Sequence, residues 1–253
     1  MVGIPLLIVL VWASVYTTEV LVAVSAVIAL YEFCRLGPTP MALPLVLLTL
    51  SVGVLFTVNA ALGGALTVPL VTGAVTIPLL LTALLPAAQR SSASWAWSVA
   101  GMLLVGWTLS LAVLLRMHAQ GREWLIVTIG LTFAIDTSAY FFGKVLGRRK
   151  LAPTISPGKT WEGAIAGFLV GGVAAVVLTQ GFGLDVSWYL AAALGLTVSV
   201  AAQLGDLAES MIKRGVGAKD AGSLVPGHGG LLDRLDSLIP SCAVLYFFVT
   251  LLG

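Results

Sequence analysis

Apolar stretches of membrane-spanning length, separated by short polar breaks, run through almost the whole of this sequence. A helix needs about 17–25 mostly apolar residues to cross a bilayer, and only helices and closed barrels satisfy their backbone groups inside it. Hydrophobic residues make up 59% of the chain and charged residues only 9%, whereas soluble domains are about 45–50% apolar. These properties predict an all-α integral membrane protein and exclude an ordinary soluble domain.

The polar breaks divide the sequence into about nine predicted membrane helices. They cover roughly residues 3–16, 18–34, 42–59, 67–86, 96–115, 124–143, 163–182, 188–206 and 236–252. The first two are the hardest to separate, because Glu19 and Glu32 are the only charges between residues 3 and 33. We expect a tight hairpin that turns near Thr17, Thr18 and Glu19, with one long tilted helix as the alternative. No Lys or Arg precedes the first apolar run, so we expect this segment to stay in the mature fold rather than act as a signal peptide.

Basic residues predict the orientation of these helices, because Lys and Arg are enriched in cytoplasmic loops. If the N-terminus is cytoplasmic, every Lys and Arg except Arg116 and Arg122 falls on the inside. This predicts a multi-pass protein of the cell inner (cytoplasmic) membrane, with the N-terminus inside and the C-terminus outside. The two long polar loops, about 144–162 and 207–235, then face the cytoplasm. We expect a single polytopic domain over residues 1–253, with N-terminal helices in 1–120 and a catalytic half in 124–253.

The polar chemistry of the chain is concentrated in one window near its C-terminal end, residues 210–236. The charged residues and the histidine of this window are Lys213, Arg214, Lys219, Asp220, His228, Asp233, Arg234 and Asp236. Charged residues in or beside a bilayer are costly and usually mark function. Cations beside carboxylates and glycines are typical of sites that hold phosphate groups with a divalent metal. The window therefore predicts an enzyme site on the cytoplasmic side.

Two further polar segments are expected to reach the same face. Asp136 lies in an apolar span near its cytoplasmic end, where a carboxylate is usually functional; a structural hydrogen bond between helices is the alternative. The run Ser156-Pro-Gly-Lys159-Thr160 is expected to form a turn with exposed amides beside a lysine at a helix entrance, which favours anions. It lacks the Walker A spacing, so it is not a P-loop. We interpret the neighbouring Arg148–Lys150 run as an anchor for lipid headgroups.

A polar stripe on a predicted helix leads into the window: Gln203, Asp206, Ser210 and Lys213 recur at helical spacing. We expect Asp206 to end that helix and Asp233 to begin the next one, so that folding the intervening loop back brings the two carboxylates together. Two carboxylates in a half-dry site repel each other, and a bound cation relieves the repulsion. The predicted core metal ligands are Asp206 and Asp233, with Asp136, Asp220 and Asp236 as further candidates.

These residues resemble the signature of the phosphatidate cytidylyltransferases, the CDP-diacylglycerol synthases, in which S-x-x-K-R and K-D lead to P-x-H-G-G-x-x-D-R-x-D. The matching positions are Ser210, Lys213, Arg214, Lys219, Asp220, Gly222, Pro226, His228, Gly229, Gly230, Asp233, Arg234 and Asp236. The segments 136–140, 156–163 and 205–210 also look like motifs of that family. Val225 is a conservative departure, and Gly158 stands where a Lys is common, which removes one phosphate contact. The N-terminal half matches only in hydropathy.

The resemblance implies that CTP and phosphatidic acid react to give CDP-diacylglycerol and pyrophosphate in a lipid bilayer. It also implies dependence on Mg²⁺, with a second divalent or a monovalent cation beside it, a homodimer with nine membrane helices, and no nucleic-acid partner. The catalytic residues it implies are Asp206, Asp233, Lys219, Arg214, Asp220 and Asp236. The implied substrate-binding residues are Lys159, Ser156, Thr160, Lys213, Arg214, Lys219, His228, Gly229, Arg234 and Ser210. For His228 we expect a phosphate or nucleotide contact rather than a general-acid role.

Two other classes of protein remain open as alternatives. An ion-coupled transporter would use Asp136 and Asp206 as intramembrane binding groups, but transporter sites lie near the midplane of the bilayer, whereas these polar residues crowd one interface. Another membrane nucleotidyl- or phosphotransferase, such as a polyprenol kinase, would share the metal chemistry. Such an enzyme gives no reason for this particular signature.

Overall fold

The computed structural model describes residues 13–222 and 229–252, and in these residues the chain is helical apart from one β-hairpin. The helices are α2 (Val15–Arg35), α3 (Leu43–Ala61), α4 (Thr67–Leu84), the 3₁₀ turn η1 (Ala87–Gln89), α5 (Ser92–Gly101), the π-helical η2 (Met102–Trp107), α6 (Thr108–Met117), α7 (Gly121–Val145), α8 (Trp161–Gly181), α9 (Trp188–Gly215), α10 (Leu232–Leu235) and α11 (Leu238–Leu252). The strands are β1 (Lys150–Ala152) and β2 (Ser156–Thr160).

Seven helices of the described chain are long and apolar enough to cross a bilayer. They are α2, α3, α4, the continuous helix Ser92–Met117 formed by α5, η2 and α6, and then α7, α8 and α9. Each coincides with one predicted span between residues 18 and 206. The predicted span 236–252 corresponds to α11, which is apolar but shorter than the others. Most of the predicted span 3–16 lies outside the described residues, so the total of nine stays a prediction.

The expected turn near Thr17 is wrong, because these residues form the first turn of α2. The helix starts at Val15, and Ser14 before it has an extended backbone. The Ser14 hydroxyl accepts the N–H of Thr17 at 3.0 Å, and the Thr17 hydroxyl accepts the N–H of Ser14 at 3.1 Å. This reciprocal capping satisfies free donors at the helix start. The chain therefore breaks about one turn earlier than hydropathy indicated.

The expectation that Asp206 ends its helix is also wrong, because α9 continues to Gly215. Backbone hydrogen bonds continue through the polar residues that follow Asp206, so the helix extends beyond its apolar stretch. Asp206, Ser210 and Lys213 therefore lie on successive turns of one helix, which confirms the predicted polar stripe. The next helical segment after the window is the short α10, which is separated from α11 by Asp236 and Ser237.

The segment Ser156–Thr160 forms strand β2, not the predicted turn. It pairs antiparallel with β1, with Lys150 opposite Thr160 and Ala152 opposite Ser156. The backbone pairing with β1 decides the conformation, and a two-stranded hairpin tolerates Pro157 because a strand edge can lack a donor. The expected helix entrance at Trp161 is confirmed: the Thr160 hydroxyl accepts the N–H of Gly163 at 3.2 Å and so caps α8.

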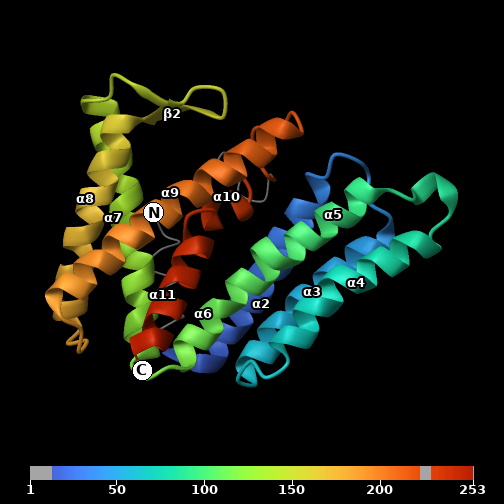
Figure 1. Ribbon diagram of the computed structural model, residues 1–253, viewed down its shortest axis with the longest axis horizontal. Helices are drawn as coiled ribbons and strands as arrows, with labels where there is room; N and C mark the ends of the chain where they lie inside the picture. The colour runs from blue at the N-terminus through green and yellow to red at the C-terminus, as the bar shows by residue number, and fades with distance from the viewer. Residues whose placement is uncertain (1–12, 223–228, 253) are drawn as a thin grey trace.

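The helices form two groups in space, as Figure 1 shows. Helices α2 to α6 run side by side as one slanted group, and α7, α8, α9 and α11 form the other, with the β-hairpin at one end of α7 and α8. The two groups meet where α11 packs against α6 and where α10 packs against α2. The main cluster of buried apolar residues includes side chains from both groups, among them α2, α6, α7, α9 and α11.

A stripe of glycines on α8 lets the second group pack closely. Gly163, Gly167 and Gly171 recur every four residues and are buried, a spacing that allows close helix approach in membranes. A Cβ atom on Gly163 would lie 2.5 Å from the backbone oxygen of Ala139 in α7, and one on Gly171 would lie 3.1 Å from that of Gly195 in α9. Because α8 touches both neighbours this closely, the ends of α7 and α9 come together beside the hairpin.

Candidate functional site

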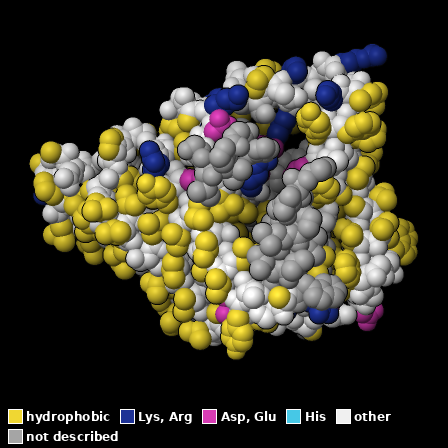
Figure 2. Space-filling model, turned by 180° about the vertical axis from the view of Figure 1, so that it is seen from behind, with side chains coloured by type: hydrophobic (Ala, Val, Ile, Leu, Met, Phe, Trp, Pro, Cys, Tyr) yellow, Lys and Arg dark blue, Asp and Glu magenta, His cyan; other side chains and the backbone are white. Residues whose placement is uncertain are grey.

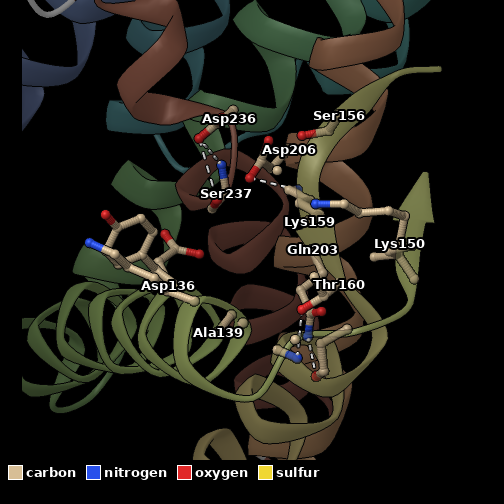
Figure 3. Close-up of a pocket in the computed structure, with 18 of the residues that line it drawn as sticks. Asp136, Ala139, Lys150, Ser156, Lys159, Thr160, Gln203, Asp206, Asp236 and Ser237 are labelled. Carbon is tan, nitrogen blue, oxygen red and sulfur yellow. Dashed lines mark hydrogen bonds and ion pairs between the residues drawn. The ribbon is translucent and has the colours of Figure 1, made fainter. Parts of the chain in front are cut away.

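A pocket of about 780 Å³ lies where α7, the β-hairpin, α8, α9 and the segment 233–237 meet. Its charged lining residues are Asp136, Lys144, Lys150, Lys159, Asp206, Asp233 and Asp236. In Figure 3 the labelled side chains from α7, from β2, from α9 and from the segment before α11 surround one space. Figure 2 shows charged side chains gathered around a hollow towards one end of the molecule, while apolar side chains cover much of the remaining face. The structure thus brings together the three polar segments that the sequence analysis singled out.

An ion pair between β2 and α9 lies in this pocket. Lys159 Nζ is 2.6 Å from Asp206 Oδ2, and the Ser210 hydroxyl donates a long hydrogen bond of 3.4 Å to Asp206 Oδ1. Ser210 reaches Asp206 because the two are one helical turn apart on α9. A cation and a carboxylate that line a cavity together can each exchange partners when an anion or a metal ion enters. Asp206 and Lys159 are therefore the best-placed predicted residues for such exchange.

Asp236 faces the pocket from the break between α10 and α11. Its Oδ1 accepts the backbone N–H of Ser237 at 2.7 Å and the Ser237 hydroxyl at 3.3 Å. Burial and then the nearby carboxylate of Asp206 raise the pKa of Asp236 to about 6. Asp136 on α7 lines the same space. Three carboxylates therefore share one partly dry cavity, which disfavours keeping all of them ionised without a cation.

Asp233 also lines the pocket, but its oxygens already have several donors. It forms an ion pair with Lys213, and its Oδ2 accepts the backbone N–H groups of Ala221 at 2.9 Å and Gly230 at 2.7 Å. Burial raises the pKa of Asp233, but the hydrogen bonds from Lys213, Gly230 and Ala221 outweigh it and hold the pKa below its usual value. Asp233 therefore joins the two ends of the segment 221–230, in addition to facing the pocket.

The other predicted residues differ in where the structure places them. Ser156 and Thr160 line the pocket. Arg214, Lys219, Asp220 and Arg234 are exposed and are not among its lining residues, and the Arg214 guanidinium donates to the Ala218 carbonyl at 3.3 Å. Gly229 has a left-handed backbone, and a Cβ there would lie 2.7 Å from Asp233 Oδ2. His228 lies outside the described residues.

Several residues around the site have positions that could not be predicted from the sequence. Lys144 and Lys150 line the pocket, although Lys150 was interpreted as part of a headgroup anchor; its position on β1 opposite Thr160 could not be read from the sequence. Glu209, one helical turn before Lys213 on α9, is buried, and its Oε1 lies 3.1 Å from Lys213 Nζ. Glu32 of α2 contacts the segment after Gly229. The signal for Glu32 was a lone carboxylate in an apolar span, a feature that is usually functional.

The chemistry of the donor set fits Mg²⁺, because the pocket offers carboxylate oxygens and Mg²⁺ takes one or two carboxylates together with waters and substrate phosphates. Among residues 13–222 and 229–252, no three His, Cys, Asp or Glu side chains converge closely enough to hold a metal ion by themselves.

Fold and site together define a multi-pass membrane protein with an acidic and basic pocket suited to phosphate groups. The sequence matches the profile of the cytidylyltransferase family over residues 1–252, and the chain belongs to that family. It is 43% identical over 159 residues to the phosphatidate cytidylyltransferase of Brucella suis, an alignment that covers 60% of this chain and 56% of that protein.

Two mycobacterial relatives give a similar result. The chain is 40% identical over 143 residues to the phosphatidate cytidylyltransferase of Mycobacterium tuberculosis, covering 56% of this chain and 43% of the relative. It is 41% identical over 143 residues to the enzyme of that name from Mycobacterium leprae, covering 56% of this chain and 46% of the relative. The chain thus spans about half the length of the curated relatives that it matches.

Proposed function

We propose that this protein transfers the cytidylyl group of CTP to phosphatidic acid, giving CDP-diacylglycerol and pyrophosphate. The observation that carries the proposal is the pocket that Lys159, Asp206 and Asp236 line together. Membership of the cytidylyltransferase family and similarity to proteins named phosphatidate cytidylyltransferase support the choice of reaction. A phosphatidate phosphate is already an anionic nucleophile near neutral pH, so the reaction needs no Ser, Cys or His nucleophile.

The surroundings of the pocket suit a lipid substrate. Tyr140 lines the pocket and is 70% exposed. Close to it in the sequence, Phe141 is 59% exposed, and Trp161 and Ile165 at the start of α8 are 52% and 54% exposed. Apolar side chains on the outer surface of membrane helices face acyl chains, whereas the pocket itself carries charge. A lipid with an anionic headgroup can place its phosphate inside while its acyl chains stay in the bilayer.

The proposed roles of the residues follow from charge. Lys159, with Lys144 and Lys150 around it, binds phosphate oxygens of CTP and of phosphatidic acid and lowers the repulsion between the two anions. One phosphatidate oxygen forms a bond with the α-phosphorus of CTP, and the bond from that phosphorus to the β-phosphate oxygen breaks, so that pyrophosphate leaves. Arg214, Lys219, Arg234 and His228 stay in the proposal as further contacts of the triphosphate, because they match the family signature.

Asp206 and Asp236 are the proposed ligands of Mg²⁺, since Asp233 already accepts hydrogen bonds from two backbone groups and pairs with Lys213. Asp233 as a direct ligand, Asp136 as a third carboxylate, and a second divalent or monovalent cation remain part of the prediction. Mg²⁺ held by these carboxylates would supply positive charge to the triphosphate and to the departing pyrophosphate. Lys159 lines the same pocket and binds the substrate phosphates.

The proposed setting is the inner (cytoplasmic) membrane, with the pocket on the cytoplasmic side. The distribution of Lys and Arg supports this orientation. The orientation also agrees with the proposed use of CTP, which is a cytoplasmic metabolite. We also propose that the protein is a homodimer, as the resemblance to the family implies.

The experiment that tests the proposed function follows the label of CTP into lipid. Purified protein in mixed micelles with phosphatidic acid is given CTP labelled either at the α- or at the γ-phosphate, with and without EDTA. The proposal predicts α-label in the lipid, γ-label in pyrophosphate, and no transfer with EDTA. Transfer of γ-label to a lipid would instead indicate a kinase, and no chemical turnover with any label would favour a transporter.

A further inference from the structure

Glu32 is a buried carboxylate in the N-terminal group of helices, which otherwise contributes apolar surface. It lies in the last turn of α2 and is only 6% exposed. Burying a carboxylate is costly unless hydrogen bonds compensate for it. The hydrogen-bond donors that compensate for this cost therefore show which part of the molecule Glu32 stabilises.

Those contacts are with the backbone around the start of α10. The N–H of Leu231 donates to Glu32 Oε1 at 3.1 Å, and the N–H of Leu232 donates to Oε2 at 2.8 Å. The first residues of a helix have free N–H groups, and here a side chain from a distant helix accepts them. The next residue is Asp233, which lines the pocket. Glu32 thus holds the backbone directly before one of the pocket carboxylates.

Two glycines of the signature leave room for this carboxylate. A Cβ atom on Gly222 would lie 2.5 Å from Glu32 Oε1, and one on Gly230 would lie 2.5 Å from Oε2. Neither glycine has the left-handed backbone that would itself require glycine. The carboxylate therefore excludes a side chain at both positions. At these two positions the close neighbour of the backbone is therefore Glu32.

We propose that Glu32 is a positioning residue of the active site: it accepts the backbone N–H groups of Leu231 and Leu232, packs closely against Gly222 and Gly230, and so sets the position of Asp233 and Asp236 in the pocket. Its effect on turnover rests on the proposed function, whereas its effect on the backbone of the loop does not. This assigns a specific role to α2, which lies in the half of the chain where the sequence alone showed no signature motif.

Hydrogen–deuterium exchange of the purified protein, without substrates, tests the backbone contact. In Glu32→Gln one oxygen is replaced by an NH₂ group, which cannot accept an N–H, so peptides that cover residues 229–235 should exchange roughly tenfold faster or more. Glu19→Gln is the matched control, because Glu19 lies on the same helix about three turns away. Its exchange over residues 229–235 should equal that of the wild type.

A double-mutant cycle tests the link to the pocket. Gly222→Ala should displace the Glu32 carboxylate and lower kcat by roughly tenfold or more, as should Glu32→Gln, while the KM for CTP changes less. Because both changes remove the same contact, the double variant should be no worse than the poorer single variant. Glu19→Gln should keep wild-type activity.

Unchanged exchange over residues 229–235 in both Glu32→Gln and Gly222→Ala would overturn the proposal. Losses of kcat that multiply in the double variant would also overturn it, because they would show two independent effects. If Glu32→Gln does not fold, Gly222→Ala measures the same displacement with the carboxylate still present. If the wild-type protein does not turn over CTP, the proposed function fails, and the exchange measurement still decides whether Glu32 holds the loop.

Discussion

The ion pair between Lys159 and Asp206 places a cation in the pocket before any substrate is bound. Replacing Lys159 with Gln removes this charge while keeping much of the side-chain length. We expect kcat to fall by roughly 100-fold or more, as for other groups that stabilise charge in a transition state. Arg149→Ala is the control, because the Arg149 side chain is exposed and its contacts with Glu162 and Trp161 use its backbone. It should change the rate of label transfer less than threefold, since exposed charges contribute little.

Equal losses in Lys159→Gln and Arg149→Ala would point to a general effect of charge at the membrane surface. Lys159 would then have no specific role in the pocket.

Asp236 and Asp233 face the same pocket but have different hydrogen-bond partners, so their Asn variants should differ. Asp236→Asn removes a proposed metal ligand, and we expect the Mg²⁺ concentration for half-maximal activity to rise roughly tenfold or more. Asp233→Asn turns an NH₂ group towards N–H donors of Ala221 or Gly230 and weakens the pair with Lys213. We expect faster amide exchange over residues 219–222 and 229–233 in this variant.

Titrating Mg²⁺ and measuring amide exchange in both variants separates the two roles. If Asp233→Asn shifts the Mg²⁺ requirement while amide exchange in the loop stays at the wild-type rate, Asp233 is the direct ligand that the sequence analysis predicted.

At the scale of residues, the sequence predicts which side chains line one site, but not which groups each side chain contacts. The signature and the helical spacing brought Asp206, Asp233 and Asp236 to one place, and the structure places all three around one pocket. The spacing could not show that Asp233 accepts two backbone N–H groups, because those donors come from residues whose fold depends on the whole loop. The partners of Glu32 could not be predicted for a similar reason, because they lie about 200 residues away in the chain.

The close packing of α8 against its neighbours depends on small residues, which gives a prediction at the scale of helices. A Cβ on Gly171 would lie 1.9 Å from Ser199 Oγ and 3.1 Å from the Gly195 carbonyl. Gly171→Ala should therefore destabilise the protein by about 1–3 kcal/mol, a usual cost of overpacking. Gly181→Ala on the same helix is the matched control, because a Cβ there would contact nothing within 4 Å.

Thermal unfolding in detergent measures both variants. A midpoint for Gly171→Ala that equals those of the wild type and Gly181→Ala would contradict the close contact between α8 and α9.

Hydropathy predicts the long helices well because a bilayer imposes their length. It predicts their ends less well, because capping and continued backbone hydrogen bonds decide them. Ser14 starts α2 earlier than the polar residues suggested, and α9 continues past Asp206. The hairpin could not be predicted from Ser156–Thr160 alone, since Pro and Gly favour a turn and the strand forms only by pairing with Lys150–Ala152.

The whole molecule is expected to expose the pocket to the cytoplasm, and the orientation can be measured with reporters. A reporter fused after Gly253 should be active only in the outer compartment, and one inserted after Gln120, between α6 and α7, should behave in the same way. A reporter inserted after Arg148, between α7 and β1, should be active only in the cytoplasm. The physical reason is the bias of Lys and Arg towards one side.

A cytoplasmic signal from the fusion after Gly253 would mean that the number of spans is wrong. Opposite signals from all three fusions would reverse the orientation and place the pocket outside.

The most direct test of the account is label transfer from α-labelled CTP to phosphatidic acid by the wild-type protein and by Asp206→Asn, measured side by side in the same micelles. Asp206 pairs with Lys159 in the pocket, is a proposed ligand of Mg²⁺, and lies in a segment that looks like a motif of the family. We therefore place the reaction at this residue. We predict labelled CDP-diacylglycerol with the wild type, and a loss of about 1,000-fold or more with Asp206→Asn, although the variant elutes and unfolds like the wild type. Substantial transfer by a folded Asp206→Asn protein would contradict the assignment of the reaction to this pocket.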